Sequence, residues 1–349
     1  MIKVIHAADF HLDAPFSTLS PALAGQRRRE QRLALQQFAK ACEGCEIVLL
    51  AGDLFDGKQV YQDTLDALRD CFASLSARVF IAPGNHDVLC TGSPYLTEKW
   101  SENVHIFTDS SIKRVELEGC HVYGAAYTAQ GEEVLRDFRV ADPDVVNLMV
   151  LHSGDSYNPI TPAQIAASGL DYLALGHIHT RQVDRTGGTV FAYSGCLMGR
   201  GFDECGQKGL LRVDVSKDEV QSRFVPIYSR RYEILTVQVG EDGEGAVRAA
   251  LPEDAYDHAY RVILQGESEP IHLPTLQRRL SDCCFHLELV DETYPPQELW
   301  QGAEEDTLRG ALLSNLKARY EAAPEGESAR VMRAAQILHA LMENREVEL

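Results

Sequence analysis

Five short apolar segments, each followed at once by a polar cluster, constrain the fold of this chain more than any other feature. Each segment has the length and apolar content of a strand. The clusters are Asp9 and His11 after Ile2–His6, Asp53 and Asp56 after Ile47–Leu50, Asn85, His86 and Asp87 after Val79–Ile81, His152 after Val145–Leu151, and His177 and His179 after Tyr172–Leu175. In α/β sheets, sites are built at the carboxyl ends of the strands. We therefore predict an α/β fold whose polar clusters share one edge.

Helical segments alternate with strands over the first 230 residues, which is typical of α/β layers. Further strands are predicted at Val104–Phe107, His121–Ala125, Val190–Tyr193 and Gly209–Val215, and helices at Ala24–Glu43 and Tyr61–Ser76. A short helix is predicted to begin at Thr161, because Pro162 would lie in its first turn and Gly169 just past its end.

The sequence changes character near Tyr228, and we predict three domains. The first covers residues 1–229 and carries the polar clusters, a small α+β cap covers 230–299, and a helical tail covers 300–349. The cap is predicted from strands in "RRYEILTVQVG", Tyr260–Gln265 and Phe285–Val290, a helix at Leu273–Leu280, and a turn-rich acidic gap at "EDGEG". The tail is predicted to form amphipathic helices at Glu304–Ala322 and Ser328–Glu343.

Composition predicts a globular protein in a reduced cytoplasm. The chain has 349 residues, of which 45% are hydrophobic and 24% charged. It has no long uncharged apolar run, and its start shows no signal-peptide pattern, so we predict no membrane span and a cytoplasmic location. Its nine cysteines include one lone CxxC pair, Cys42 and Cys45, which we interpret as structural or incidental because no partner motif accompanies it. The net charge of −19 is unfavourable for a broad nucleic-acid surface, and only short arginine clusters oppose it.

The residue types in the clusters indicate a metal site. Aspartate, histidine and asparagine together suit Mn²⁺ first, with Fe or Zn²⁺ as alternatives. A single strand-end histidine is usually structural, but this ordered set is hard to obtain by chance. The candidate ligands are Asp9, His11, Asp53, Asn85, His152, His177 and His179. Seven ligands are too many for one ion, and a carboxylate can bridge two, so the sequence predicts two divalent metal ions that act on a phosphoester.

The motifs DFH, GDLFD, GNHD, LHS and GHIH resemble those of the calcineurin-like metallophosphoesterase superfamily over roughly residues 1–200. The resemblance implies a two-sheet sandwich flanked by helices. It implies that Asp9, His11, Asp53 and His179 hold one metal, and that Asp53, Asn85, His152 and His177 hold the other. It also implies that His86 is the catalytic histidine and that Asp87 orients it. On an extended stretch His177 and His179 would point to the same side, whereas the resemblance sends them to different ions.

Within the superfamily, the chain is similar to the DNA repair exonucleases, the nuclease-subunit family of SbcD with its YhaO-like members. The start "HAADFHLDAPF" and the segment "AYSGCLMGRGFDECGQKGLLRVDV" carry this similarity, although Ser194 stands where proline is usual, and Asp56 stands where some members have a histidine. The resemblance implies a DNA exonuclease in which a metal-bound hydroxide attacks phosphorus in line. It also implies a coiled-coil ABC-type ATPase as partner. Arg200 is our candidate contact for the substrate strand, with a structural role equally open.

Other interpretations remain open at this level. A small-molecule or nucleotide phosphodiesterase or phosphatase with the same centre would suit the acidic charge. A non-catalytic scaffold for an ATPase partner would be expected to lack ligands, and none is missing. The apolar stripes of the tail helices, Leu308, Leu312 and Leu316 in the first of them, would pack on the cap or bind a partner helix. The oligomeric state is open, a homodimer included. His6, His105, His121, His258, His272, His286 and His339 are predicted not to bind metal.

Overall fold

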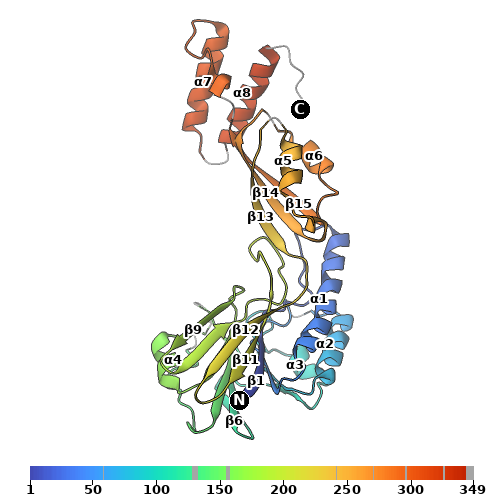
Figure 1. The fold of residues 1–349 in the computed structure, drawn as a ribbon, viewed down its shortest axis with the longest axis vertical. Helices are drawn as coiled ribbons and strands as arrows, with labels where there is room; N and C mark the ends of the chain where they lie inside the picture. The colour runs from blue at the N-terminus through green and yellow to red at the C-terminus, as the bar shows by residue number, and fades with distance from the viewer. Residues whose placement is uncertain are drawn as a thin grey trace. The chain divides into compact units, whose positions relative to one another are not determined.

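The computed structural model describes residues 1–57, 59–127, 133–154, 158–240, 242–269, 271–294, 297–324 and 327–342. The chain forms two compact units, Met1–Arg231 and Tyr232–Leu349 (Figure 1). This division falls just after the predicted boundary at residue 229. The predicted separation of cap and tail at residue 299 stays a prediction.

Two six-stranded sheets make up the first unit. The first sheet has the order β12-β11-β1-β2-β3-β4. In it β1, β2, β3 and β4 run parallel, whereas β11 is antiparallel to both β1 and β12. Its strands are β1 (Ile2–Ala7), β2 (Ile47–Leu50), β3 (Arg78–Ile81), β4 (Val104–Ile106), β11 (Gly209–Val215) and β12 (Val220–Pro226). The second sheet has the order β5-β6-β7-β8-β10-β9, with antiparallel strands at both edges. Its strands are β5 (Lys113–Leu117), β6 (Cys120–Gly124), β7 (Val146–His152), β8 (Tyr172–Gly176), β9 (Gln182–Thr186) and β10 (Thr189–Tyr193).

The central strands are buried on both faces, which explains their continuous apolar runs. Val4 and Leu49 lie in the core between the two sheets, whereas Ile5 and Leu50 lie in the core under the helices. Helices α1 (Pro21–Ala41) and α2 (Gln62–Ser74) cover the outer face of the first sheet, and α4 (Pro162–Ser168) packs on the second (Figure 1). The four layers confirm the predicted two-sheet sandwich flanked by helices.

Helix ends follow local capping chemistry. The predicted start of α4 is confirmed: Thr161 and Gln164 form a capping box, Pro162 is the first helical residue, and Gly169 ends the helix in the left-handed conformation. The predicted start of α1 at Ala24 is wrong. Ser20 caps the helix and it begins at Pro21, because the serine side chain accepts from the backbone N–H of Leu23.

The second unit has a sheet of three parallel strands, β13 (Tyr232–Gln238), β14 (Ala259–Glu267) and β15 (His286–Tyr294). Helices α5 (Gly243–Ala250) and α6 (Leu273–Arg279) pack on it through Val247 and Leu276. The "EDGEG" stretch was predicted as a turn-rich gap, and this is wrong for most of it. The Asp242 side chain accepts from the N–H of Gly245, so α5 starts at Gly243.

Two further helices close the chain, α7 (Leu308–Ala322) and α8 (Ser328–Met342), and they pack on each other. The predicted start at Glu304 is too early, because Thr307 caps α7. Residue 343, the predicted end of the last helix, lies outside the described residues. No helix in the described part of the chain is both long and apolar enough to cross a bilayer.

Some short elements escaped prediction: the edge strands β5, β9 and β12, and the short helix α3 (Pro94–Thr97). The edge strands read KRVEL, QVDRT and VQSRFVP, and most of their residues are exposed or half-buried. A strand at a sheet edge buries little surface, so it carries no long apolar run. The missed strands therefore lie where hydrophobic patterning is weakest.

Gly176 allows the two sheets to approach each other at the end of β8. A Cβ added there would lie 1.9 Å from the Ala51 carbonyl oxygen, at the end of β2 in the other sheet. We predict that Gly176→Ala lowers the free energy of unfolding by about 1–3 kcal/mol, because the rigid backbone on both sides must shift. Urea unfolding followed by circular dichroism measures the change.

Gly25 provides the matched control, since a Cβ there meets nothing within 4 Å and the residue lies inside α1. Gly25→Ala is expected to raise stability by about 0.5–1 kcal/mol through helix propensity. Equal stability of the two variants would show that the space between Gly176 and Ala51 can accept a methyl group, contrary to this prediction.

Candidate metal centre

The five predicted clusters meet where the carboxyl ends of the two sheets come together. Asp9 and His11 follow β1, Asp53 follows β2, and Asn85 follows β3, all in the first sheet. His152 is the last residue of β7, and His177 and His179 follow β8, in the second sheet. The side chains of Asp9, His11, Asp53, His86, His152 and His179 form overlapping groups whose possible ligand atoms lie within 4.8 Å of one another. These groups include five of the seven predicted ligands, and Asn85 and His177 adjoin them through contacts of the Asn85 side chain with His152 and His177.

Four of these residues have the left-handed backbone that non-glycine residues rarely adopt. The φ angles are 53° at Asp9, 44° at His11, 51° at Asp53 and 99° at His177. Backbone hydrogen bonds hold the first two turns together, from Asp9 N to Gly52 O at 3.0 Å and from His11 N to Asp53 O at 2.9 Å. Such residues each cost about 1–3 kcal/mol and tend to cluster at functional sites.

His177 and His179 belong to different groups of side chains. The expectation from an extended stretch, that they point to the same side, is wrong because β8 ends at Gly176 and the chain turns sharply at His177. His177 Nδ1 lies 3.1 Å from Asn85 Oδ1. His179 Nε2 lies 3.3 Å from His11 Nε2. This is the separation that the family resemblance implies.

Asp53 lies between the two groups. Its Oδ2 atom is 3.8 Å from His11 Nε2 on one side and 3.4 Å from His152 Nε2 on the other. Asp9 Oδ1 completes the first group at 3.9 Å from His179 Nε2, and Asn85 Oδ1 completes the second at 2.8 Å from His152 Nε2. Asp53 is therefore placed where one carboxylate can bridge two cations.

An outer layer of acceptors fixes the proton on three of the histidines. His11 Nδ1 lies 2.8 Å from Asp56 Oδ1, His179 Nδ1 lies 2.7 Å from Glu204 Oε1, and His152 Nδ1 lies 2.8 Å from the Ala51 carbonyl oxygen. Because these partners accept hydrogen bonds, each Nδ1 carries the hydrogen and each Nε2 presents a lone pair. Burial lowers the pKa of His11 to about 3 and that of His152 to about 4, so both rings are neutral.

The facing lone pairs fit a cation. With these tautomers, no hydrogen lies between the Nε2 atoms of His11 and His179, which are 3.3 Å apart, and the His152 Nε2 lone pair faces the Asn85 carbonyl oxygen. Acceptors that face one another repel unless a positive charge lies among them. The donor set of imidazole nitrogens, carboxylates and one amide oxygen suits first-row divalent metals.

The inner carboxylates point to the same conclusion. Asp9 and Asp53 are almost fully buried, and each accepts a backbone N–H, from His177 and His86 respectively. Burial, and next the charge of Asp53, raise the pKa of Asp9 well above its usual value. Burial and the charge of Asp87 raise the pKa of Asp53 to about 7. Divalent cations in the site would favour the ionised forms of both groups.

Arg200 binds two outer carboxylates. Its Nη1 atom donates to Asp56 at 3.0 Å and its Nη2 atom donates to Glu204 at 2.7 Å. The sequence left the role of Asp56 open, and Glu204 was not among the predicted site residues. The signal for Glu204 is its place four residues after Arg200 in "GRGFDE". The guanidinium thus joins the two acids that orient His11 and His179, and this geometry supports the structural interpretation of Arg200.

His86 lies at the open side of this cluster. Its side chain is 45% exposed, its backbone N–H donates to Asp53 Oδ1 at 2.9 Å, and its ring packs edge-on against His11. The carboxylate beside the ring is that of Asp56, with Asp56 Oδ1 3.7 Å from His86 Nδ1. The His86 imidazole is therefore free to meet a substrate while its backbone is held by a predicted ligand.

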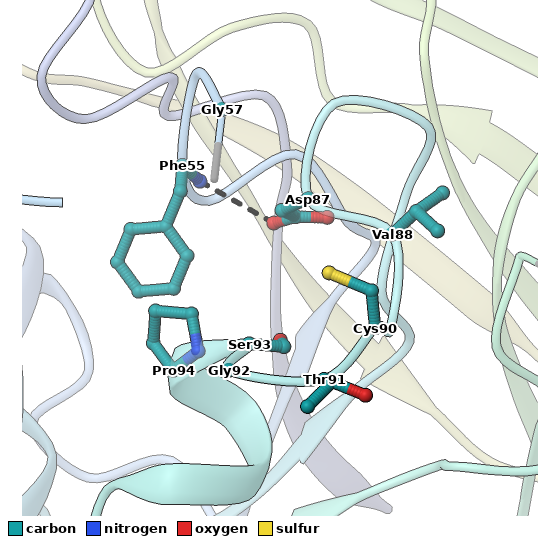
Figure 2. A pocket seen from close by; sticks show the side chains of 9 residues that line it. All are labelled: Phe55, Gly57, Asp87, Val88, Cys90, Thr91, Gly92, Ser93 and Pro94. Atoms are coloured by element: carbon teal, nitrogen blue, oxygen red, sulfur yellow. Dashed lines mark hydrogen bonds between the residues drawn. The ribbon is translucent and has the colours of Figure 1, made fainter. Parts of the chain in front are cut away.

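Asp87 does not orient His86, and that prediction is wrong. Its buried carboxylate accepts from the N–H groups of Gly84, Leu54 and Phe55 and from the Tyr95 hydroxyl. Figure 2 shows this carboxylate at the side of a small pocket of about 70 Å³, across from the Phe55 backbone. Asp87 therefore ties together the loops that follow β2 and β3, and it positions Asp53 and Asn85 through the backbone.

His6 illustrates the histidines that were predicted not to bind metal. It lies fully buried, with Nδ1 2.8 Å from the Tyr172 hydroxyl and Nε2 3.1 Å from the Leu175 carbonyl oxygen. Burial lowers its pKa to about 3, so it is a neutral hydrogen-bonding residue that links the two sheets.

Two proteins of known sequence resemble this chain. It is 30% identical over 352 residues to the uncharacterized metallophosphoesterase YhaO of Bacillus subtilis (strain 168), a match that covers 90% of this chain and 84% of the relative. It is 29% identical over 167 residues to the DNA double-strand break repair protein Mre11 of Methanocaldococcus jannaschii, which covers 43% of this chain and 44% of that relative.

Among solved structures, the chain is similar to Vps29 of Entamoeba histolytica complexed with zinc. The two share 13% sequence identity with a TM-score of 0.34, and the match covers 65% of this chain and 100% of that chain. Vps29 of Cryptosporidium parvum matches with 15% identity and a TM-score of 0.31, over 64% of this chain and 97% of that chain. Residues 2–181, which include all seven predicted ligands, match the family described as Calcineurin-like phosphoesterase. This chain belongs to the calcineurin-like phosphoesterase family.

Proposed function

We propose that this protein is a phosphodiesterase that hydrolyses DNA with two divalent metal ions. The observation that carries the proposal is the meeting of two ligand groups at the Asp53 carboxylate. Asp9, His11, Asp53 and His179 would hold one ion, and Asp53, Asn85, His152 and His177 the other. When bound, two such ions lower the pKa of a water molecule and neutralise the charge that develops on the phosphate oxygens.

The residues of the chain then have distinct tasks. Asp56 and Glu204 hold the rings of His11 and His179, so their Nε2 lone pairs stay aimed into the site. His86, exposed beside them, would hydrogen-bond a phosphate oxygen or protonate the leaving 3′ oxygen. Arg200 holds Asp56 and Glu204 in place and leaves the substrate to other residues.

The choice of Mn²⁺ as the first candidate metal rests on the mixed donor set. Mg²⁺ and Ca²⁺ prefer sites made only of oxygen ligands, and the histidine nitrogens do not fit that preference. The two carboxylates and the amide are hard ligands, so they favour Mn²⁺ over the softer metals that thiolate ligands select. Fe and Zn²⁺ remain the alternatives. The metal content of the purified protein decides among them.

DNA is proposed as substrate on the strength of sequence similarity. The "HAADFHLDAPF" start and the segment that runs from β10 into β11 resemble those of DNA repair exonucleases. The relative Mre11 is named as a DNA double-strand break repair protein, and it matches 43% of this chain. These similarities favour DNA over a small phosphoester.

A second candidate function is the hydrolysis of a small phosphodiester or nucleotide. The net charge of −19 favours it, because an acidic surface repels a polyanion more than a small substrate. A third interpretation, a non-catalytic scaffold, is disfavoured because all seven ligands are present and meet in space.

A coiled-coil ABC-type ATPase is the partner that we propose for the last two helices. Leu308 in α7 is 77% exposed and Leu341 in α8 is 61% exposed. Leu312, one turn after Leu308, is exposed as well. Apolar side chains repeated along one helix form the kind of surface that binds a partner helix.

We predict that the purified protein with Mn²⁺ degrades labelled DNA, and that Asp53→Asn does so at a rate lower by at least about 100-fold. The substitution removes the charge that both ions share and leaves the shape of the side chain. Rates on single-stranded and double-stranded ends, on nucleotides and on bis-p-nitrophenyl phosphate measure the preference. Turnover of nucleotides without any cleavage of DNA would establish the second candidate function instead.

We predict that His86→Ala lowers kcat by about 10²–10⁴-fold, the usual contribution of a general acid or base. The metal content should stay at the wild-type value, because the imidazole is not among the proposed ligands. Kinetics and metal analysis of the same preparation test both parts. Near-normal kcat, or loss of a metal ion, would assign His86 a different role.

We predict that Glu204→Gln weakens Mn²⁺ binding at one of the two sites by about 10–100-fold, because the His179 ring loses its charged partner. Titration calorimetry with Mn²⁺ resolves the two binding steps. Asp203→Asn is the matched control, since Asp203 is an exposed neighbour outside the cluster. Equal weakening of both steps, or of neither, would argue against separate sites for His177 and His179.

A further inference from the structure

A second pocket lies beside the candidate metal centre and includes His179 in its wall. Its volume is about 350 Å³, within the range of about 300–1,000 Å³ that is typical of ligand sites. The wall is formed by the loop after β8, the loop after β10, the segment before β11 and Phe224 of β12. The function proposed above assigns no role to this pocket.

Arg181 and Lys208 give the pocket a positive charge. Within the described residues neither side chain forms an ion pair, whereas Arg27, Arg69 and Arg200 each bind a carboxylate. Acidic residues outnumber basic ones by 52 to 33 in this chain, so most cations find an acidic partner easily. Two unpaired cations in one pocket are therefore available to an anion.

An aromatic ring holds Arg181 in place, and in the described part of the chain its guanidinium donates no hydrogen bond. Its guanidinium carbon lies 4.5 Å from the centroid of the Phe224 ring, a cation–π contact. The planar guanidinium can therefore offer a pair of N–H groups to a phosphate in bidentate geometry. Phe224 thus orients Arg181 before any ligand binds.

Lys208 links the pocket to the backbone of a proposed metal ligand. Its Nζ donates to the His179 carbonyl oxygen at 3.4 Å, and an ammonium group has two more hydrogens to offer. Gly195 lets the loops after β8 and β10 approach each other here. It has φ 75°, and a Cβ added there would lie 2.9 Å from the His179 carbonyl oxygen.

We propose that this pocket binds the backbone phosphate next to the scissile one on a single DNA strand. The assignment rests on the proposed function, because it takes the polymer to be the substrate of the neighbouring centre. Arg181 and Lys208 would both donate to this phosphate, and Thr180, Ser194 and Gln207 supply polar groups around it. Arg181 and Lys208 thereby replace Arg200 as the substrate contacts, since Arg200 is bound to Asp56 and Glu204.

The test measures binding of a short fluorescein-labelled single DNA strand by anisotropy, with Mn²⁺ present. It uses the His86→Ala background, in which hydrolysis is expected to be slow. Added to that background, Arg181→Gln is expected to weaken binding by about tenfold, as for a lost charge-assisted hydrogen bond. The slope of log affinity against log salt should fall by up to about 0.7, the value for one phosphate contact on a single strand. Lys208→Gln should act in the same way. Arg181→Lys should retain part of the affinity, because lysine keeps the positive charge but lacks the paired N–H groups of the guanidinium.

Arg185→Gln is the matched control, because Arg185 is an exposed arginine on β9 outside the pocket wall. It removes the same charge and should leave the affinity near that of the background protein. If Arg181→Gln and Lys208→Gln bind the strand as tightly as Arg185→Gln, the pocket is not a phosphate site, although the protein still cleaves DNA. If the wild-type protein neither binds nor cleaves DNA, both the proposed function and this assignment are wrong.

Discussion

The burial of Asp9 and Asp53 among imidazole lone pairs is the constraint on which the rest of the first unit depends. Among the described residues, neither carboxylate accepts from a lysine or an arginine, and the pKa of each is raised by burial and by neighbouring acids. Isolated charges in such a place are expensive unless a cation accompanies them. The strained backbone at both residues adds to this cost. We infer that the fold is built to hold positive ions here, and that it is least stable without them.

The two sheets provide the stiffness that such a site needs. Parallel strands buried on both faces deliver ligands from β1, β2 and β3 in one sheet and from β7 and β8 in the other. Asp87 ties two of the loops through backbone N–H groups, and Arg200 ties the outer acids. The hydrogen bonds of these outer groups keep the candidate ligands aimed at one point.

The sequence allowed the layered fold and the meeting of the candidate ligands at one edge to be predicted, because both follow from strong local signals. Buried strands carry continuous apolar runs, and the ligands stand directly after them. The edge strand β9 and the role of Glu204 were missed, because neither shows in hydrophobic patterning. The error at Asp87 has a different cause: the family resemblance assigned this residue to orient His86, whereas its side chain accepts from the backbone of Gly84 and Leu54. Adjacent residues on a turn need not face the same neighbour.

The charge of −19 does not decide between DNA and a small substrate, because electrostatics act locally in this site. Salt screens exposed charges beyond a Debye length of about 8 Å at physiological ionic strength. Two divalent ions would add four positive charges within the metal centre, and Arg181 and Lys208 add two more in the pocket that includes His179 in its wall. A DNA strand would meet positive charge only at the metal centre and in this pocket. The net negative charge of the rest of the protein would disfavour long non-specific contacts with DNA. Such a distribution suits an enzyme that engages a strand over few phosphates near the reacting bond.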